Sequence, residues 1–391
     1  MSRVLFVVPP LTGHTRPTIA VGAELLERGH EVAWAGHPAI LGALLPPGAG
    51  LFAAGELELP DSQGLRGLEA LRFLWDDGLI PLARKMAPEL DAAIAAFDPD
   101  LLVVDQHALA GAVAARRHRL PWVTSATTTV DLFDPLDGLP KLQAWVQSRV
   151  DLLGEPGDET VDLRRSDLLM LVYSTEMLVG GDLPFPDHYA FVGPSLPRQE
   201  PDGEDFPWEW FDDRHRHLLV SLGTVTQAGG RDFLGRAIEA FADPDAGFRL
   251  VVVAPDGMFE DAGEHVLLRP TVPQLGVLAR VDAVITHAGH NTVCESLAHG
   301  LPLVLAAIRD DQPAIAQQVV EAGAGIRVKY GRVRPDGLRK AVLTVLEDPS
   351  YRRAAHELQA SFAAAGGAGA AVDRLEQVLP GVCQPDHGLR S

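Results

Sequence analysis

Residues 286–300 read Thr-His-Ala-Gly-His-Asn-Thr-Val-Cys-Glu-Ser-Leu-Ala-His-Gly, and they carry the strongest structural signal in the chain. An apolar run, 281–285, precedes them, and from Asn291 onward the composition is that of a helix start. The pattern predicts a buried strand, a tight turn and a helix N-terminus. Free backbone N–H groups and the helix dipole favour an anion at such a point. We therefore expect an anion-binding loop in an α/β fold.

The side chains of this stretch suggest which anion would bind. His287, Asn291 and Thr292 add hydrogen-bond donors, and Glu295 follows Asn291 by four residues, on roughly the same helix face. Phosphate donors one turn before a carboxylate suggest a diphosphate next to a sugar with vicinal hydroxyls. A structural alternative stays open at this point. Thr292 and Glu295 also form a capping box that needs no ligand, Gly289 could be a plain turn glycine, and His287 a loop histidine.

Composition excludes several classes of protein. A chain of 391 residues predicts two or three domains, and the net charge of −20 argues against nucleic-acid or anionic-membrane binding. The two cysteines, Cys294 and Cys383, are too far apart to indicate a disulfide framework or a zinc site. The apolar run 4–8 ends in two prolines and favours a buried strand over a signal peptide. No apolar run approaches the ~18 residues of a membrane span, so we expect a cytoplasmic protein.

Strand and helix patterns alternate in two series. A strand at 4–8, a loop at 9–15, a helix that contains Pro17 in its first turn and stops at Gly29, and a strand at 31–35 form a βαβ unit, which implies a parallel sheet. Further strands are predicted at 101–104, 122–124, 218–222, 250–253, 283–285 and 303–306, with a helix at 108–117. Neither half has a G-x-G-x-x-G after its first strand, and no P-loop occurs, which argues against a dehydrogenase and a P-loop NTPase.

The domain organisation follows from these series. Residues 1–200 are predicted to form an N-terminal domain, with a linker at about 193–212 that is rich in Pro, Asp, Glu and Gly. Residues 213–378 are predicted to form a C-terminal domain. Its terminal helical pattern, 351–378, is broken at Gly366 and Gly367, and we leave open whether the last helix crosses back to the N-terminal domain. Residues 379–391 are expected to be a flexible tail. Two doubly wound Rossmann-like domains of this kind would face a central cleft at the carboxyl ends of their strands.

Four segments in this order resemble the family 1 glycosyltransferases of the GT-B fold, especially the actinobacterial enzymes that glycosylate natural products. The segments are 13–17 with 28–32, 221–224, 273–274 leading into 287–302, and 311–312. They span most of the chain but leave roughly 40–95 and 125–190 unmatched.

The resemblance implies that the N-terminal domain, 1–200, binds the acceptor and that the C-terminal domain, 213–378, binds the nucleotide-sugar donor. It also implies roles for individual residues. His14 holds the place of the general base, and Asp105 that of the carboxylate that orients it. His287, with Asn291 and Thr292, matches the contacts to the donor diphosphate, Glu295 the carboxylate that binds ribose hydroxyls, and Asp311 with Gln312 the pair that binds the donor sugar. The remaining predicted donor-site residues are Ser221, Gly223, Thr224, Val272, Gln274 and Gly289. Three residues depart from the family pattern: Ala288 for glycine, Ala307 for proline, and Thr271 for the tryptophan that stacks on the base.

The chemistry predicted from these residues needs no metal and no cofactor beyond the nucleotide-sugar, because backbone and imidazole donors would neutralise the leaving diphosphate. His37, His107 and His290 are expected to be structural or exposed. Aromatic and apolar residues of the unmatched segments are predicted to line a hydrophobic acceptor pocket, although core packing is the simpler interpretation for each: Phe73, Trp75, Phe133, Trp145 and Met170.

The resulting hypothesis is an inverting glycosyltransferase. It would move a hexose or deoxyhexose from a dTDP- or UDP-sugar to a small hydrophobic natural product, as a monomer or homodimer in the context of antibiotic biosynthesis. Two alternatives remain at this stage: a GT-B epimerase acting on UDP-N-acetylhexosamine, and a non-catalytic GT-B-like binding protein.

Overall fold

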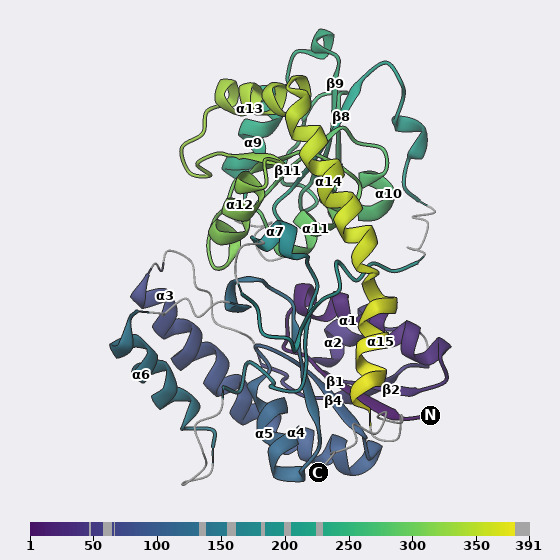
Figure 1. Cartoon of the computed structure of the whole chain (residues 1–391). Coiled ribbons are helices and arrows are strands. Elements are labelled where there is room, and N and C mark those ends of the chain that lie inside the picture. Colours follow the sequence, from purple (N-terminus) through teal and green to yellow (C-terminus); the bar gives the residue numbers. More distant parts are fainter. Residues whose placement is uncertain are drawn as a thin grey trace. The chain divides into compact units, whose positions relative to one another are not determined.

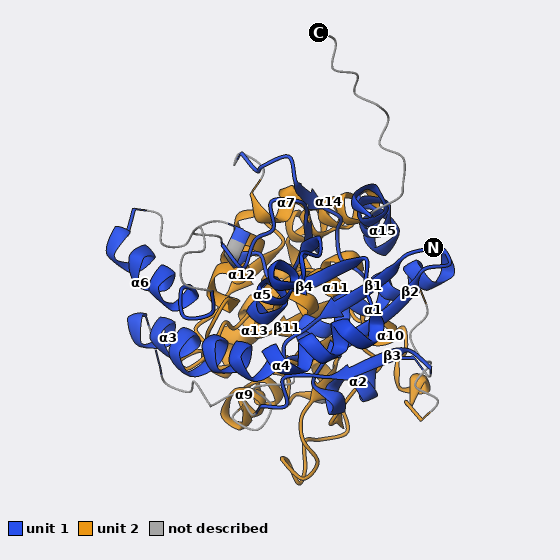
Figure 2. Cartoon of the chain, turned by 90° about the horizontal axis from the view of Figure 1, so that it is seen from below, with its two compact units in different colours: residues 1–173, 184–196, 365–391 blue, residues 174–183, 197–364 orange. Residues whose placement is uncertain are grey.

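The computed structural model describes residues 1–46, 48–57, 65, 67–132, 138–154, 162–180, 184–198, 205–223 and 230–379. The chain forms two compact units, coloured separately in Figure 2. The first unit comprises Met1–Tyr173, Pro184–Leu196 and Ala365–Ser391, and the second comprises Ser174–Leu183 and Pro197–Ala364. The chain passes between the units at 196–197, inside the expected linker, whose residues 199–204 lie outside the described part of the chain. The predicted tail from 380 onward also lies outside it.

The first unit is built on a parallel sheet with the strand order β3-β2-β1-β4-β5-β6-β7. Its strands are β1 (Arg3–Val7), β2 (Glu31–Gly36), β3 (Gly50–Ala53), β4 (Leu101–Asp105), β5 (Trp122–Ala126), β6 (Met170–Val172) and β7 (Tyr189–Phe191). Alternate residues of β1 face two different cores: Leu5 and Val7 belong to one, Val4 and Phe6 to the other. A sheet buried on both faces explains why its strands are continuous apolar runs.

Helices cover both faces of this sheet (Figure 1). They are α1 (Thr12–Glu27), α2 (Pro38–Leu44), α3 (Leu68–Phe73), the π-helical segment η1 (Leu74–Leu79), α4 (Ile80–Phe97), α5 (Leu109–His118), the short η2 (Val130–Leu132), α6 (Pro140–Val150) and α15 (Gly367–Val378). The last helix, α15, packs against α1. Arg28, just after α1, joins the two helices by donating to Asp373 and Glu376 at 2.7 and 2.9 Å.

The second unit contains a second parallel sheet, with the order β10-β9-β8-β11-β12-β13. Its strands are β8 (Arg216–Ser221), β9 (Phe248–Val253), β10 (Val266–Arg269), β11 (Ala283–Thr286), β12 (Leu303–Leu305) and β13 (Gly325–Arg327). Its helices are α7 (Glu176–Val179), η3 (Trp208–Trp210), α9 (Arg231–Ala240), η4 (Pro244–Ala246), α10 (Gln274–Leu278), α11 (His290–Ala298), α12 (Gln312–Glu321), α13 (Pro335–Glu347) and α14 (Pro349–Ala365).

The structure confirms the predicted strands to within two residues at either end. It also confirms the break between the two terminal helices, because Gly366, the N-cap of α15, and Gly367, its first residue, adopt φ values of 89° and 60°. The expected loop at 9–15 is too long, since α1 already begins at Thr12 after the extended residue Leu11. Pro17 therefore lies inside the helix and not in its first turn. In the described part of the chain, no helix is both long and apolar enough to span a membrane.

Candidate active site

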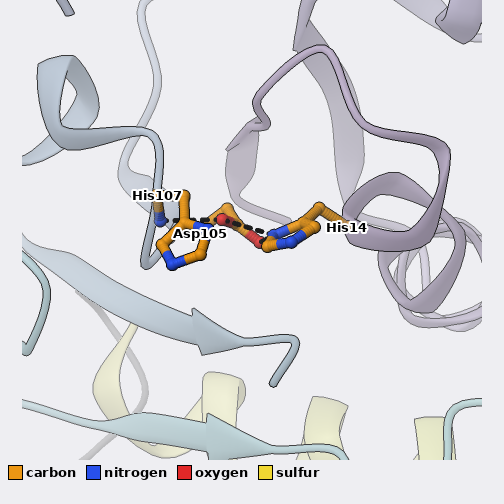
Figure 3. A group of neighbouring side chains, drawn as sticks. All are labelled: His14, Asp105 and His107. Atoms are coloured by element: carbon orange, nitrogen blue, oxygen red, sulfur yellow. Dashed lines mark hydrogen bonds and ion pairs between the residues drawn. The ribbon is translucent and has the colours of Figure 1, made fainter. Parts of the chain in front are cut away.

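The imidazole of His14 and the carboxylate of Asp105 lie together in the first unit. His14 is in the first turn of α1, which follows β1, and Asp105 is the last residue of β4. Because β1 and β4 are parallel neighbours, their carboxyl ends meet at one edge of the sheet. Nδ1 of His14 is 3.0 Å from each carboxylate oxygen of Asp105 (Figure 3). The Asp105 side chain has no exposed surface, whereas 16% of the His14 side chain is exposed.

Two further residues hold the Asp105 carboxylate. Thr127, just after β5, donates its hydroxyl hydrogen to Oδ2 at 2.7 Å, and its oxygen lies 2.7 Å from Nδ1 of His14. The backbone N–H of His107 donates to Oδ1 at 2.8 Å. Sequence reasoning did not single out Thr127. The sequence places Thr127 just after β5, the strand that pairs with β4. Thr128 and Thr129 have the same relation to β5, so the sequence does not show which threonine contacts Asp105.

These donors keep Asp105 charged. Burial alone would raise the pKa of Asp105, but the charge and hydrogen bond of His14, with the donors at His107, outweigh it and lower that pKa below its usual value. A charged carboxylate accepts the hydrogen of Nδ1, so Nε2 of His14 carries the lone pair. Among the residues that the structure describes, none forms a hydrogen bond with Nε2. The pair is therefore equipped to accept a proton at Nε2.

In the second unit, two glycines enclose the ring of His287, which lies in the loop between β11 and α11. A Cβ atom at Gly223 would lie 2.6 Å from Cε1 of His287, and one at Gly289 would lie 2.5 Å from Nε2. Burial lowers the pKa of His287 to about 4, against the raising effects of the Asp311 charge and a hydrogen bond to the Ser221 backbone. The ring is therefore neutral near pH 7, with one N–H directed to that backbone carbonyl.

Gly289→Ala tests whether this close packing matters. Gly289 has φ −65°, which alanine adopts readily, so the expected effect is steric displacement of His287. If His287 contacts the diphosphate, the lost hydrogen bond should weaken nucleoside-diphosphate binding by about 10- to 100-fold. Isothermal titration calorimetry measures this. Gly42→Ala in α2 is the matched control, since its Cβ would meet nothing within 4 Å. Unchanged affinity in Gly289→Ala would contradict the proposed contact.

The helix α11 begins as an uncapped N-terminus. Its first residue is His290 and its N-cap is Gly289, with no side-chain cap hydrogen bond. Thr292 is the third residue inside the helix, so the capping-box alternative for Thr292 and Glu295 is wrong. Asn291 lies in the same first turn and is partly exposed. The first N–H groups of a helix have no partner within it, and this end therefore suits an anion.

One turn further along α11, Glu295 is 8% exposed. The amide nitrogen of Gln274, the first residue of α10, donates to Oε2 of Glu295. Gln274 was predicted as a donor-site residue, and the structure places it as a hydrogen-bond partner of the Glu295 carboxylate. A carboxylate held in this way presents a fixed acceptor for hydroxyl groups.

Gln312 is similarly fixed at the start of α12. Its side-chain oxygen accepts the backbone N–H groups of Ile308 and Arg309 at 2.9 and 3.1 Å, and the residue is 8% exposed. Because the oxygen is occupied, the amide N–H₂ is the group that can serve a ligand. Asp311 is the N-cap of α12 but makes no side-chain cap hydrogen bond.

The remaining donor-site predictions follow strands of the same sheet. Ser221 ends β8, is 3% exposed, and accepts the N–H of Gly223 at 3.4 Å. Val272 is partly exposed between β10 and α10. Thr224 lies outside the described residues. Like His287, Ser221 and Val272 follow the carboxyl ends of strands, which is the ligand-binding edge of open parallel sheets.

The predicted acceptor pocket needs correction. Trp75 is 2% exposed in the core under α4, and Met170 is 1% exposed in β6, so both are packed in the interior of the first unit. Trp145 is partly buried against the same core as Trp75, and Phe73 is partly exposed. Phe133 lies outside the described part of the chain. Among the four predicted pocket residues that the structure describes, Phe73 and Trp145 are the two that retain exposed surface.

Comparison with known proteins shows the class to which this fold belongs. Residues 256–378 match the family of the erythromycin biosynthesis protein CIII-like C-terminal domain. The chain is 29% identical to 4'-demethylrebeccamycin synthase of Lentzea aerocolonigenes, covering 97% of this chain and 100% of that protein. It is 27% identical to the NDP-glycosyltransferase YjiC of Bacillus licheniformis, covering 95% and 96%. The solved structure of the glycotransferase of kitacinnamycin superposes with a TM-score of 0.81, at 27% identity, covering 97% of this chain and 99% of that one.

The chain therefore has the GT-B fold, and it is a glycosyltransferase of the hexosyltransferase class. More particularly, it is a homologue of the glycosyltransferases of actinobacterial antibiotic pathways, which move a sugar from a nucleotide-linked donor.

Proposed function

We propose that this protein is an inverting, metal-independent glycosyltransferase that moves a hexose or deoxyhexose from a dTDP- or UDP-sugar to a small hydrophobic acceptor. The observation that carries the proposal is the contact of His14 with Asp105. Both carboxylate oxygens lie 3.0 Å from Nδ1, and the carboxylate is fully buried. This arrangement supports a general base at Nε2 of His14, with Asp105 as the group that orients it.

The proposed reaction is a single displacement. Nε2 of His14 takes the proton of an acceptor hydroxyl, and Asp105 stabilises the imidazolium that forms. The acceptor oxygen forms a bond to the anomeric carbon as the bond from that carbon to the diphosphate breaks. Attack opposite the leaving group inverts the configuration. Holding both substrates in place for this step can contribute about 7–11 kcal/mol in well-oriented systems.

The proposed donor site belongs to the second unit. The N-terminus of α11, with Asn291 and His287, would receive the diphosphate charge, and Ser221 lies on the neighbouring strand. Glu295, held by Gln274, would accept hydrogen bonds from ribose hydroxyls. Gln312, through its amide N–H₂, and Asp311 would bind the sugar. Prearranged donors of this kind are usually the largest single catalytic contribution.

Product stereochemistry tests the proposed reaction. Incubation with α-linked dTDP- or UDP-sugars and hydrophobic hydroxyl-bearing acceptors is expected to give β-linked glycosides, assigned from the anomeric proton coupling in NMR spectra. Retained configuration would refute the single displacement. A control without acceptor should leave the donor sugar unchanged, whereas conversion to an epimer under those conditions would indicate the epimerase reaction instead.

Donor binding is also expected to take up a proton at His287. One N–H of the neutral ring is directed to the Ser221 backbone, so donation from the other nitrogen to a diphosphate requires a second proton. The bound anion would raise the pKa of His287 above its free value of about 4. Affinity should therefore be constant above the raised pKa of His287, increase as pH falls through that value, and level off below the free value of about 4.

Calorimetry in buffers of different ionisation enthalpy counts the protons taken up. His287→Gln is the control, because it keeps a side-chain donor but does not titrate, so the proton uptake that remains belongs to the nucleotide itself. Equal proton uptake by the native protein and His287→Gln would contradict this role of His287.

A further inference from the structure

Three side chains that can ligate a metal lie together at the carboxyl edge of the sheet in the first unit. They are His14, Asp105 and His107, and one ligand atom from each lies within 4.8 Å of the other two. The His14 and His107 rings have centroids 4.9 Å apart, and Figure 3 shows the carboxylate of Asp105 between them. Asp105 is buried, whereas both histidines are partly exposed, so the group can be reached from solvent.

We propose that these three residues form an inhibitory binding site for a transition-metal dication such as Zn²⁺. Two imidazoles and one carboxylate, with a water molecule as the fourth ligand, are a common zinc-binding set. Ligand bonds of about 2.0–2.1 Å in tetrahedral geometry place ligand atoms about 3.3 Å apart. Nδ1 of His14 already lies 3.0 Å from the Asp105 oxygens.

Metal binding at this site requires the ring of His107 to move toward the other two ligands. To bring ligand atoms from 4.8 Å to tetrahedral spacing, the most distant pair must approach by about 1.5 Å. The backbone N–H of His107 donates to Oδ1 of Asp105, and a rotation of its partly exposed ring about the side-chain bonds would bring a ring nitrogen closer to the other two ligand atoms. The carboxylate is already ionised and buried, so a cation replaces hydrogen-bond donors there without further desolvation of the anion.

Metal binding to either ring nitrogen of His14 would inhibit sugar transfer. This step rests on the proposed role of His14 as base. If the metal binds Nε2, it occupies the lone pair that would accept the acceptor proton. If it binds Nδ1, that nitrogen loses its proton and the neutral ring carries its hydrogen on Nε2. In both cases no basic nitrogen remains to receive the acceptor proton.

The ligand set also predicts selectivity. Imidazole nitrogen favours Zn²⁺, Co²⁺, Ni²⁺ and Cu²⁺, whereas Mg²⁺ prefers oxygen ligands in octahedral geometry. Zn²⁺ should therefore bind and inhibit, and Mg²⁺ at the same concentration should do neither. A metal-free preparation of the full chain and an added-metal series provide the comparison.

Direct binding tests the site independently of the reaction. Zn²⁺ affinity is measured by calorimetry, and Co²⁺ is used as a spectroscopic probe because tetrahedral coordination gives intense visible absorption. His107→Ala should weaken Zn²⁺ binding by about 100-fold or more, since even indirect partners of metal ligands contribute 10- to 100-fold. His118→Ala is the matched control: that ring also contacts a carboxylate, Asp91 at 2.7 Å, but in another part of the unit. Equal Zn²⁺ affinity in the native protein and His107→Ala would overturn the proposal.

Inhibition is measured as the Zn²⁺ concentration that halves the rate of sugar transfer, relative to the metal-free rate of the same variant. In His107→Ala this concentration should rise by the same factor as the dissociation constant for Zn²⁺, and in His118→Ala it should remain unchanged. A chelator should restore the rate of sugar transfer to its metal-free value. Zn²⁺ binding that depends on His107 but leaves transfer unaffected would overturn the inhibitory role. If His14 proves not to be the base, the binding measurements still decide whether the metal site exists.

Discussion

Replacing His14 with alanine should reduce sugar transfer by about 10²- to 10⁴-fold, the usual contribution of general base catalysis. The proposed donor residues belong to the second unit, so nucleotide affinity should remain that of the native protein. Steady-state kinetics with an excess of donor measure the first effect, and calorimetry with the nucleoside diphosphate measures the second. A fall in turnover without a fall in nucleotide affinity is the result that supports a base.

The same substitution should change how stability depends on pH. In the native protein the pKa of Asp105 is lowered, so its ionised form stabilises the fold above the ordinary value of about 3.9. That contribution is lost as pH falls through the lower, folded-state value. Without His14, burial dominates and the pKa of Asp105 rises above the ordinary value. The variant should then lose stability as pH increases through that raised pKa.

Thermal unfolding across this pH range checks the sign of the effect. His118→Ala is again the control, because its partner Asp91 is substantially exposed, and an exposed carboxylate keeps its hydration when a histidine is removed. A variant His14→Ala that transfers sugar at the native rate would remove His14 from the mechanism. A pH dependence of unfolding identical to that of the native protein would show that the contact does not control ionisation of Asp105.

Much of the fold could be predicted because its strands are buried on both faces. The apolar runs 101–104 and 218–220 form the centres of two such strands, and the turns after them are marked by glycine and polar residues. The strands that the sequence did not reveal are short. They have three or four residues each, which is too few for a period to emerge: Gly50–Ala53, Met170–Val172, Tyr189–Phe191, Val266–Arg269 and Gly325–Arg327.

Local sequence predicted the part of the candidate site that lies in one motif, whereas the pairing of His14 with Asp105, which depends on strand order, was predicted only through the family resemblance. His287 to Glu295 lie within one turn-and-helix segment, so their proximity follows from local structure. Thr127 contacts Asp105 because β5 pairs with β4, and this neighbour relation is a property of the sheet. The ring of His107 lies beside His14 for the same reason, since the loops after β1 and β4 meet at one edge.

In the predicted acceptor pocket, by contrast, two core residues were assigned to a binding site. Trp75 and Met170 were attractive as pocket residues because they are large and apolar in segments that lack a clear pattern. These properties are equally those of core residues, and both side chains are almost completely buried. Trp75 lies in the π-helical segment η1, where the helical register shifts. A pattern based on 3.6 residues per turn therefore cannot predict whether the side chain of Trp75 faces the core or the solvent.

Replacing Asp105 with asparagine should lower turnover by about 10²- to 10⁴-fold through the tautomer of His14. The oxygen of the asparagine amide is expected to remain on the His107 side, because the backbone N–H of His107 can only donate. The amide nitrogen then faces Thr127 and Nδ1 of His14. A donor in that position favours the ring with its hydrogen on Nε2, where the acceptor proton should go. The neutral amide also gives no stabilisation to an imidazolium.

Thr127→Val separates the charge of Asp105 from its hydrogen-bonded surroundings. This variant removes one donor to Oδ2 but keeps the carboxylate, so turnover should fall only by roughly 10-fold. Nitrogen NMR shifts of His14 report the tautomer directly: Nδ1–H in the native protein and Thr127→Val, and Nε2–H in Asp105→Asn. An orienting role requires tautomer and turnover to change together. Native turnover in Asp105→Asn with hydrogen on Nε2 would show that the tautomer does not determine the rate, and that another group accepts the proton.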